Sequence, residues 1–253
     1  MTSVLPQISD FIDALLDINN VADWPNALNG LQLANSGRVT KIGAAVDAGE
    51  PTLRKAADAG VDLLLVHHGL FWAGLQPVTG AAFRKLSLAL GADMAIYSAH
   101  LPLDLHPALG NNALLADTLG LAPAEPFFFE KGRFLGLKAS MGSLPLPDLV
   151  ARLEKAVAGP VRVFAAGSGT VGTCGVVTGG AGSEIYKAAA EGVDTFITGE
   201  APHWAAVAAQ ELGVTLLLAG HYATETFGVK ALAAHVAGQF GIEWLFIDHP
   251  TGL

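Results

Sequence analysis

The stretch KAADAGVDLLLVHH, residues 55–68, has the composition of a helix followed by a buried strand that ends in two histidines. It aligns without a gap on KAAAEGVDTFITGE, residues 187–200, with six identities in the first eight positions. Upstream, residues 39–49 align on residues 171–181 at the same offset. Because self-similarity at a fixed offset is typical of repeated structure, the chain is predicted to contain two copies of one unit.

Short apolar runs alternate with stretches of helical composition along the whole chain. The runs are KIGAAV, DLLLV, MAIYSA, TCGVVT, DTFIT, TLLLA and EWLFI. Alternating strands and helices predict βαβ units, and continuous apolar strands are typical of mostly parallel sheets covered on both faces. We therefore expect an α/β fold of two similar domains, residues 1–124 and 125–253. The Pro-, Phe- and Gly-rich segment from PAEPFFFEKGRFLG to about AAGSG is expected to form the junction.

The composition of the 253-residue chain excludes several classes of protein. A net charge of −9 argues against nonspecific binding to nucleic acids or anionic membranes, which depends on basic patches. Cys174 is the only cysteine, so an intramolecular disulfide and a cysteine-based zinc site are excluded. The N-terminus lacks the basic start of a signal peptide, and no apolar run approaches the roughly 20 residues of a membrane span. We expect a soluble cytoplasmic protein.

Each copy also contains a histidine followed four residues later by a carboxylate. His100 and Asp104 of the first copy align with His221 and Glu225 of the second. A spacing of four places both side chains on one face of a helix. Ligands collect at the carboxyl ends of strands in open α/β sheets. If the two copies face each other, the residues that converge on one pocket are His67, His68, Asp104, His221 and Glu225.

Histidines and carboxylates in this arrangement predict a metal site. Neighbouring residues of a regular strand point to opposite sides, so His67 and His68 would serve two metals more easily than one. Asp104 and Glu225 have the chemistry to bridge two ions roughly 3.5–4 Å apart. Such a mixed donor set suits Zn, Mn, Fe, Co or Ni without choosing among them. The alternative for the histidine pair is a polar strand end that meets solvent.

Other polar residues have less defined roles. His100 is either a further ligand or a residue that orients Asp104. Glu200 occupies the position equivalent to His68 and is placed to face the same pocket. His203 is expected to start a helix. Three histidines without a repeat partner are expected to be structural, namely His106, His235 and His249.

Two glycine-rich segments resemble phosphate-binding loops. GSGTVG, residues 167–172, matches Gly-x-Gly-x-x-Gly, but a strand follows it where the dinucleotide-binding motif requires a helix. TGGAGSE, residues 178–184, follows a strand and opens a helix, so its amides would suit an anion. A plain tight turn is the preferred interpretation of the second segment.

Several motifs together resemble the Nif-three-like dinuclear-metal family, the GTP cyclohydrolase type-two homologues, and are most similar to its short bacterial branch. They follow the family order from residue 24 to residue 248 and are NGLQL, HHGLFWAG, HLPLDLHPALGNNALLADTLG, GVDTFITGE and AGHYATETFG. Where the family often has WDN before the first motif, this chain has WPNALNGLQ. The resemblance implies two interlinked α/β/α domains and a homohexamer, a trimer of dimers. It also implies that two metals are bound by His67, His68, Asp104, His221 and Glu225, with His100 close to them.

The resemblance implies metal-dependent hydrolysis of a small-molecule substrate, with GTP cyclohydrolase-like ring opening as its most concrete form. A metal lowers the pKa of water toward neutrality, so that water can attack a C–N, amide or phosphoester centre. Glu200, His100 or Tyr222 would transfer the proton. Two other classes fit the same residues, a metal carrier or insertion factor and a scaffold whose metals only hold the domains together. Open metal positions beside a pocket distinguish an enzyme from a closed structural site.

Overall fold

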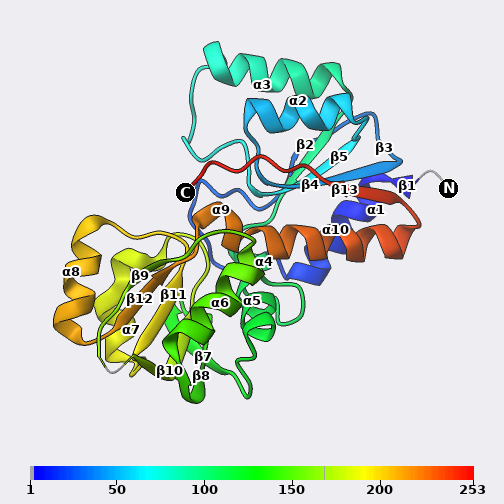
Figure 1. Cartoon of the computed structure of the whole chain (residues 1–253). Helices are drawn as coiled ribbons and strands as arrows, with labels where there is room; N and C mark the ends of the chain where they lie inside the picture. Colours follow the sequence, from blue (N-terminus) through cyan, green and yellow to red (C-terminus); the bar gives the residue numbers. More distant parts are fainter. Residues whose placement is uncertain (1–2, 168) are drawn as a thin grey trace. The chain divides into compact units, whose positions relative to one another are not determined.

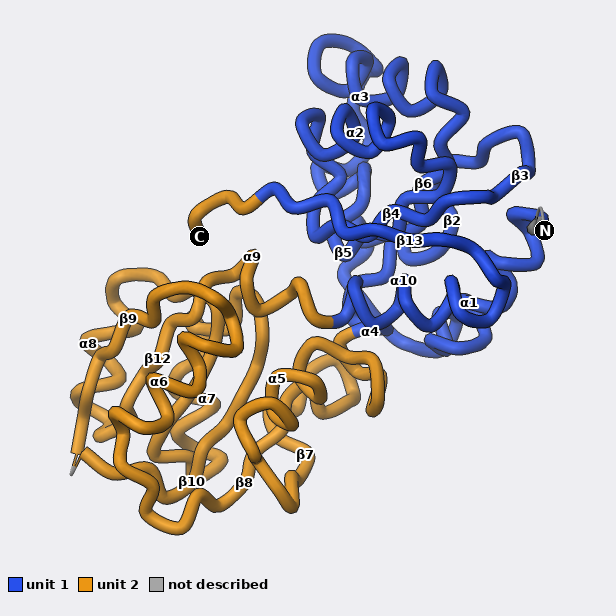
Figure 2. The backbone as a smooth tube through the Cα atoms, turned by 45° about the vertical axis from the view of Figure 1, so that its right-hand side comes forward, with its two compact units in different colours: residues 1–103, 228–249 blue, residues 104–227, 250–253 orange. Residues whose placement is uncertain are grey.

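The computed structural model describes residues 3–167 and 169–253. Met1 and Thr2, which begin the segment examined for a signal peptide, and Ser168 of the GSGTVG motif lie outside the described residues. The chain forms two compact units (Figure 2). Unit 1 comprises residues 1–103 and 228–249, and unit 2 comprises residues 104–227 and 250–253. The expected division at residue 124 followed the sequence repeat, and the compact units are divided differently.

Unit 1 is built on a five-stranded sheet. Its strands, in spatial order, are β13 (Glu243–Phe246), β4 (Lys41–Asp47), β5 (Leu63–His68), β6 (Ala95–Ser98) and β2 (Gly30–Leu33). The first four are parallel, and β2 pairs with β6 in the antiparallel direction. The carboxyl ends of β4, β5 and β6 therefore meet at one edge of this sheet.

Helices cover both faces of the unit 1 sheet (Figure 1). One face carries α2 (Glu50–Asp58) and α3 (Gly80–Gly91), and the other carries α1 (Leu5–Leu16) and α10 (Thr226–Phe240). Leu53 of α2 and Ile96 of β6 are fully buried in the core beneath the first pair. Full burial of such a side chain stabilises the fold by about 1.5–3 kcal/mol. Beside this sheet, β1 (Ser3–Val4) pairs with β3 (Arg38–Val39).

Unit 2 contains a six-stranded sheet with a parallel centre and antiparallel edges. Its strands, in spatial order, are β7 (Glu125–Glu130), β8 (Arg133–Pro145), β10 (Thr170–Val176), β11 (Thr195–Thr198), β12 (Thr215–Leu218) and β9 (Arg162–Phe164). The pairs β10–β11 and β11–β12 are parallel, and the other three pairs are antiparallel. Each sheet thus keeps parallel strands at its centre, as the apolar runs indicated.

Two hydrophobic cores, one on each face, show that helices cover the unit 2 sheet on both sides. One core contains residues of α5 (Asn111–Leu119) and α6 (Leu146–Val157). The other contains residues of α7 (Ile185–Ala190) and α8 (His203–Leu212). The 3₁₀-helix η1 (Ala181–Glu184) precedes α7, and α9 (His221–Thr224) follows β12. The predicted α/β class with two similar domains is confirmed.

The first part of the segment expected as a junction is a β-hairpin. Glu130 of β7 pairs with Arg133 of β8, so Lys131 and Gly132 form a two-residue turn. Both turn residues have positive φ, 49° and 80°, as a type I′ turn requires. Positive φ is readily adopted by glycine, and the residue–Gly pair closes the hairpin within unit 2.

The duplication is visible in individual contacts. Asp62 accepts hydrogen bonds from the backbone N–H groups of Thr40 and Lys41 at 2.8–3.0 Å. Asp194 accepts bonds from the backbone N–H groups of Gly172 and Thr173 at 2.8–3.2 Å. Asp194 is separated from Asp62 by the offset of the aligned segments. The same offset separates Gly172 from Thr40 and Thr173 from Lys41. In each copy, the aspartate that precedes one strand therefore binds the backbone of the neighbouring strand, β4 in the first copy and β10 in the second.

The two copies also exchange elements. The helix after the histidine–carboxylate element of the first copy is α5, and it belongs to unit 2. Most of its counterpart α10 belongs to unit 1, and β13 continues the unit 1 sheet beside β4. Neither half of the sequence therefore builds one unit alone. Among the described helices, none has the length and apolar character needed to cross a bilayer.

Candidate metal centre

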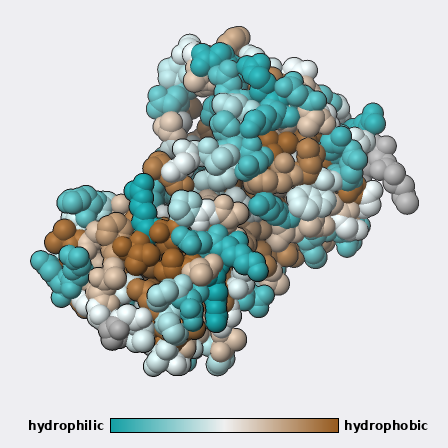
Figure 3. Space-filling view, in the orientation of Figure 1, coloured by the Kyte–Doolittle hydropathy of each residue, from teal (hydrophilic) through white to brown (hydrophobic). Residues whose placement is uncertain are grey.

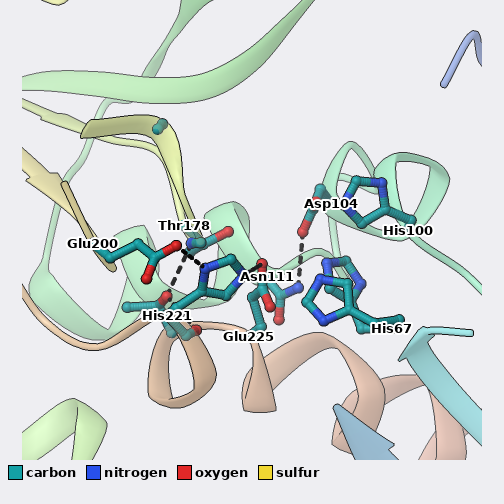
Figure 4. Close-up of polar contacts among 12 residues, drawn as sticks. His67, His100, Asp104, Asn111, Thr178, Glu200, His221 and Glu225 are labelled. Carbon is teal, nitrogen blue, oxygen red and sulfur yellow. Dashed lines mark hydrogen bonds and ion pairs between the residues drawn. The ribbon is translucent and has the colours of Figure 1, made fainter. Parts of the chain in front are cut away.

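Three histidines gather at the carboxyl edge of the unit 1 sheet. His67 and His68 end β5, and His100 stands two residues beyond the end of β6. The ring centroids are 4.8 Å apart for His67–His68, 4.8 Å for His67–His100 and 5.6 Å for His68–His100. One ring nitrogen of each lies within 4.8 Å of the others. Figure 4 shows the labelled His67 and His100 within this group.

The Nδ1 atom of each histidine has its own partner. Nδ1 of His67 lies 2.9 Å from the carbonyl oxygen of Ala99, and Nδ1 of His68 lies 2.8 Å from Asp47 Oδ1. Nδ1 of His100 lies 2.9 Å from Asp23 Oδ1. All three partners are acceptors, so each Nδ1 carries the hydrogen and Nε2 is the nitrogen suited to a metal. Imidazoles held in this way are typical of metal-binding histidines.

Asp23 holds His100 within a small polar network. Its side chain is only 6% exposed, and it accepts further hydrogen bonds from Asn29 Nδ2 at 2.8 Å and from the Leu101 backbone N–H at 2.9 Å. Asn29 Oδ1 in turn accepts the His100 backbone N–H at 2.7 Å. Burial raises the pKa of Asp23, but the hydrogen bond and charge of His100, together with hydrogen bonds from Asn29 and the Trp24 backbone, outweigh burial and hold that pKa below its usual value. The carboxylate is therefore ionised at neutral pH.

A second cluster lies at the strand ends of unit 2. His221 begins α9, Glu225 follows this helix, and Glu200 follows β11. Nδ1 of His221 lies 3.0 Å from Glu200 Oε1, and Nε2 lies 3.1 Å from Glu225 Oε1 (Figure 4). The Glu225 side chain is 5% exposed and that of Glu200 is 45% exposed. One imidazole thus stands between a buried and an exposed carboxylate.

Three glycines leave the space that the side chains of this cluster occupy. A Cβ on Gly179 would collide with Glu225 Oε1, and one on Gly180 would lie 3.4 Å from Glu200 Oε1. A Cβ on Gly199 would approach the His221 Cα to 2.6 Å. Gly179 also has φ +73°, which favours glycine. The TGG segment is followed by a 3₁₀-helix, consistent with the preferred interpretation as a tight turn.

The pKa of His221 reflects opposing influences. Burial lowers this pKa, whereas the hydrogen bonds and negative charges of Glu225 and then Glu200 raise it to about 9. Without a metal the imidazole is therefore protonated at neutral pH. A metal that binds through Nε2 must displace this proton, so metal binding and proton release are coupled.

Asp104 and Tyr222 complete the candidates in unit 2. Asp104 ends the short helix α4 (Leu101–Asp104), and its Oδ1 accepts a hydrogen bond from Asn111 Nδ2 at 2.8 Å (Figure 4). Tyr222 follows His221 in α9 and is 7% exposed, and its backbone N–H donates to the Leu253 carbonyl oxygen at 3.1 Å. The imidazole and carboxylate donors of the two clusters fit a divalent first-row metal.

Comparison with known proteins identifies the family. The model of the Duf34/NIF3 family, NGG1p interacting factor 3, matches residues 4–252. The chain belongs to the Duf34/NIF3 family. A relative from Halobacterium salinarum named GTP cyclohydrolase 1 type 2 homolog is 43% identical over 97% of this chain and 99% of its own. One of the same name from Deinococcus radiodurans is 42% identical over 90% of this chain and 87% of its own.

A solved structure of a similar protein has the same fold. The crystal structure of a protein from Thermus thermophilus superimposes with a TM-score of 0.91, at 40% sequence identity, over 99% of this chain and 100% of that one. Membership in the Duf34/NIF3 family, expected from the motifs, is thereby confirmed.

One expectation about the NIF3-type histidine pair was wrong. Ideal strand geometry placed His67 and His68 on opposite sides, but their ring centroids lie 4.8 Å apart. His68 is the last residue of β5, where the regular pleat ends, and Asp47 holds its ring at the carboxyl end of the neighbouring strand. Both imidazoles can therefore contribute to one cluster with His100.

The remaining histidines have contacts outside the two clusters. Nδ1 of His106 accepts backbone hydrogen bonds from Ala108 and Leu109 at 3.2 and 3.0 Å. His235 stacks on Phe11 with ring centroids 5.9 Å apart. His249 lies 3.4 Å from Lys55 Nζ, and His203 begins α8 as expected.

Sequence reasoning missed two carboxylates that position the histidines. Asp47 ends β4 beside the histidine pair, so the rule that ligands collect at the carboxyl ends of strands could have identified it. Asp23 lies outside the aligned segments, 77 residues from His100, and no repeat or spacing signal pointed to it. Its position immediately before the WPNALNGLQ segment was the available signal.

Proposed function

We propose that the chain binds two divalent metal ions and hydrolyses a small-molecule substrate with metal-activated water. The observation that carries this proposal is the set of three imidazoles in unit 1 whose Nδ1 atoms are all engaged by acceptors. The histidine–carboxylate cluster of unit 2 supports a second metal. The ligands of the proposed centre are His67, His68, Asp104, His221 and Glu225, with His100 beside them as a further ligand or a proton-transfer residue.

Different side chains would hold the metals, orient the imidazoles and transfer protons during hydrolysis. A divalent metal would supply Lewis acidity that polarises a substrate oxygen and acidifies water. Asp23 and Asp47 keep two imidazoles in the tautomer that presents Nε2. Glu200 is 45% exposed and contacts His221, so it can pass a proton between the cluster and solvent. His100 and Tyr222 are the other candidates for proton transfer.

The names of the relatives suggest the reaction to test first. Proteins from Halobacterium salinarum and Deinococcus radiodurans that resemble this chain are named GTP cyclohydrolase 1 type 2 homolog. Ring opening of a purine nucleotide at a C–N bond is compatible with a metal-activated nucleophile. We therefore include GTP among the candidate substrates.

Self-association is part of the proposal. We propose a homohexamer arranged as a trimer of dimers. Large apolar side chains of unit 1 that are exposed in the single chain support an interface, namely Leu75, Val78, Phe83 and Leu90. Apolar surface is also exposed on the face shown in Figure 3. Light scattering after gel filtration would give the mass of the assembly directly.

The acidic composition and single cysteine support a cytoplasmic location.

Metal analysis by mass spectrometry, together with a hydrolysis screen, tests the function. Wild-type protein should hold about two metals per chain, and Asp104→Ala and Glu225→Gln should each hold less. His249→Gln, which changes a histidine outside both clusters, is the matched control and should hold the wild-type amount. Turnover of GTP or another substrate that requires the metal and is lost in Asp104→Ala would establish the hydrolase.

The other outcomes separate the alternatives. Metal that is bound but supports no turnover, and passes readily to a weak chelator, would indicate a carrier. Metal that is retained without turnover would indicate a structural role. Protein that binds no metal after reconstitution with Zn, Mn or Fe would contradict the metal centre itself.

A further inference from the structure

Trp72 stands beside two of the three histidines of unit 1. The centroid of its ring lies 4.9 Å from that of His100 and 5.7 Å from that of His68. Both pairs of rings are nearly perpendicular, at 80°. Because edge-to-face packing of this kind fixes ring orientation, Trp72 forms a wall of the histidine cluster.

The loop that carries Trp72 is held in place by two polar side chains. Asn26 Nδ2 donates to the Trp72 carbonyl oxygen at 3.2 Å. Gln32 Oε1 accepts the backbone N–H of Leu70 at 2.7 Å, and its Nε2 donates to the Ala27 carbonyl oxygen at 3.0 Å. The position of the indole beside the cluster is therefore set by hydrogen bonds and by ring packing together.

The indole N–H of Trp72 is a buried donor. Its Nε1 atom is buried, and no hydrogen-bond partner lies within reach among the residues that the structure describes. A buried donor without a partner costs about 1–3 kcal/mol, and native proteins rarely retain one without a reason. The three acceptors that contact the histidines, Asp23, Asp47 and the Ala99 carbonyl, are engaged by Nδ1 atoms.

We propose that Trp72 determines specificity by donating its indole hydrogen bond to an oxygen of the molecule bound at the His67–His68–His100 cluster. The ligands selected are those that present a carbonyl, carboxylate or phosphoryl oxygen next to the metal. A donor that faces an oxygen gaining negative charge also stabilises that charge during hydrolysis. The inference rests on metal binding by the cluster, as the proposed function requires.

Two metal ligands of different chemistry test the proposal on zinc-loaded full-length protein. Acetohydroxamate offers oxygen acceptors, whereas imidazole binds metal through nitrogen and offers none. Trp72→Phe keeps an aromatic ring and removes the N–H. Calorimetry should show that Trp72→Phe binds acetohydroxamate about 2- to 13-fold more weakly, the range of one neutral hydrogen bond, while imidazole affinity stays unchanged.

A spectroscopic measurement supports the test without changing Trp72. The other three tryptophans, Trp24, Trp204 and Trp244, are each more than a third exposed, and their replacement by Phe leaves one indole N–H signal. Acetohydroxamate should move this proton signal downfield in the NMR spectrum, and imidazole should not do so. This readout stands even if Trp72→Phe fails to fold.

The outcomes distinguish this inference from the proposed function. If zinc titration shows no binding to the wild-type protein, the metal centre fails and the inference fails with it. If zinc binds, but Trp72→Phe loses affinity for both ligands equally or for neither, only the role of the indole N–H is overturned. An indole signal that ignores acetohydroxamate would overturn it as well.

Discussion

Asp23 and His100 are 77 residues apart in the sequence, and their side chains meet at 2.9 Å with the aspartate 6% exposed. The contact joins the segment between α1 and β2 to the loop after β6. It fixes the imidazole of His100 beside those of His67 and His68. A carboxylate that fixes a metal-binding imidazole in this way also increases its basicity.

Asp23→Asn should weaken metal binding by unit 1. The amide keeps the shape of the side chain but loses the charge that orients His100, so we expect an affinity 10- to 100-fold lower in a chelator competition assay. Asp10→Asn, an exposed change on α1, is the matched control and should bind metal like the wild type. Equal affinities in all three proteins would contradict a positioning role.

Gly179→Ala should disrupt the His221–Glu225 cluster. The added Cβ would collide with Glu225 Oε1, and φ of +73° adds backbone strain. Gly192→Ala is a matched control, because φ is +82° there and a Cβ would meet nothing within 4 Å. Both variants should lose some thermal stability, but only Gly179→Ala should lose metal measured by mass spectrometry. Equal metal content in both variants would show that the collision with Glu225 does not affect metal binding and that backbone strain is the only effect of the added Cβ.

The stability of metal-free protein should fall with pH because of His221. Its pKa is raised to about 9 in the fold, against about 6.5 in an unfolded chain. This contribution is complete below about pH 6.5 and is lost as the pH rises through about 9, and it amounts to no more than about 3 kcal/mol. Thermal midpoints in EDTA should therefore converge for wild type and Glu225→Gln as the pH rises. A gap that is constant with pH would argue against this coupling.

Cys174 should be inert in the native protein. It is fully buried in β10, and burial, followed by the charge of Asp194, raises the pKa of its thiol well above the usual range. A disulfide reagent should label it only after unfolding in guanidinium, giving one thiol per chain. Rapid labelling at neutral pH would indicate that the unit 2 sheet opens locally.

Asp62→Ala and Asp194→Ala should destabilise the protein to a similar extent. Each change leaves two backbone N–H groups without their charged acceptor, and a hydrogen bond to a charged group contributes about 1.5–3 kcal/mol. Denaturant unfolding would measure both. Asp58→Ala, an exposed change at the end of α2, should have little effect. A large loss in only one of the two aspartate variants would show that the copies have diverged energetically.

The repeat predicted more of the fold than any single motif. The offset that aligned Asp62 with Asp194 also aligned their hydrogen-bonded backbone partners, because both carboxylates accept hydrogen bonds from the backbone of the neighbouring strand. The His100 and His221 elements were found in the same way. The sequence showed the histidine pair but misplaced its rings, since His68 ends the strand and Asp47 determines where its imidazole lies.

Features that depend on one copy alone were harder to predict. Asp23 has no counterpart in the aligned segments, so only the folded chain brings it to His100. The hairpin at Lys131 and Gly132 was not recognised within the expected junction, because proline and phenylalanine obscured a two-residue turn. The unit boundaries also differ from the sequence division because α10 and β13 belong to unit 1, which periodicity cannot show.

The exchange of α5 and α10 bears on how such a chain arose. A single ancestral copy that gave its last helix to another unit would have been complete only as a pair of identical chains, each lending that helix to its twin. Joining the two genes would have turned this association between molecules into one within a molecule, with a large gain in effective concentration. Once fused, the halves no longer needed to remain identical, and His68 and Glu200 occupy matching positions with different chemistry.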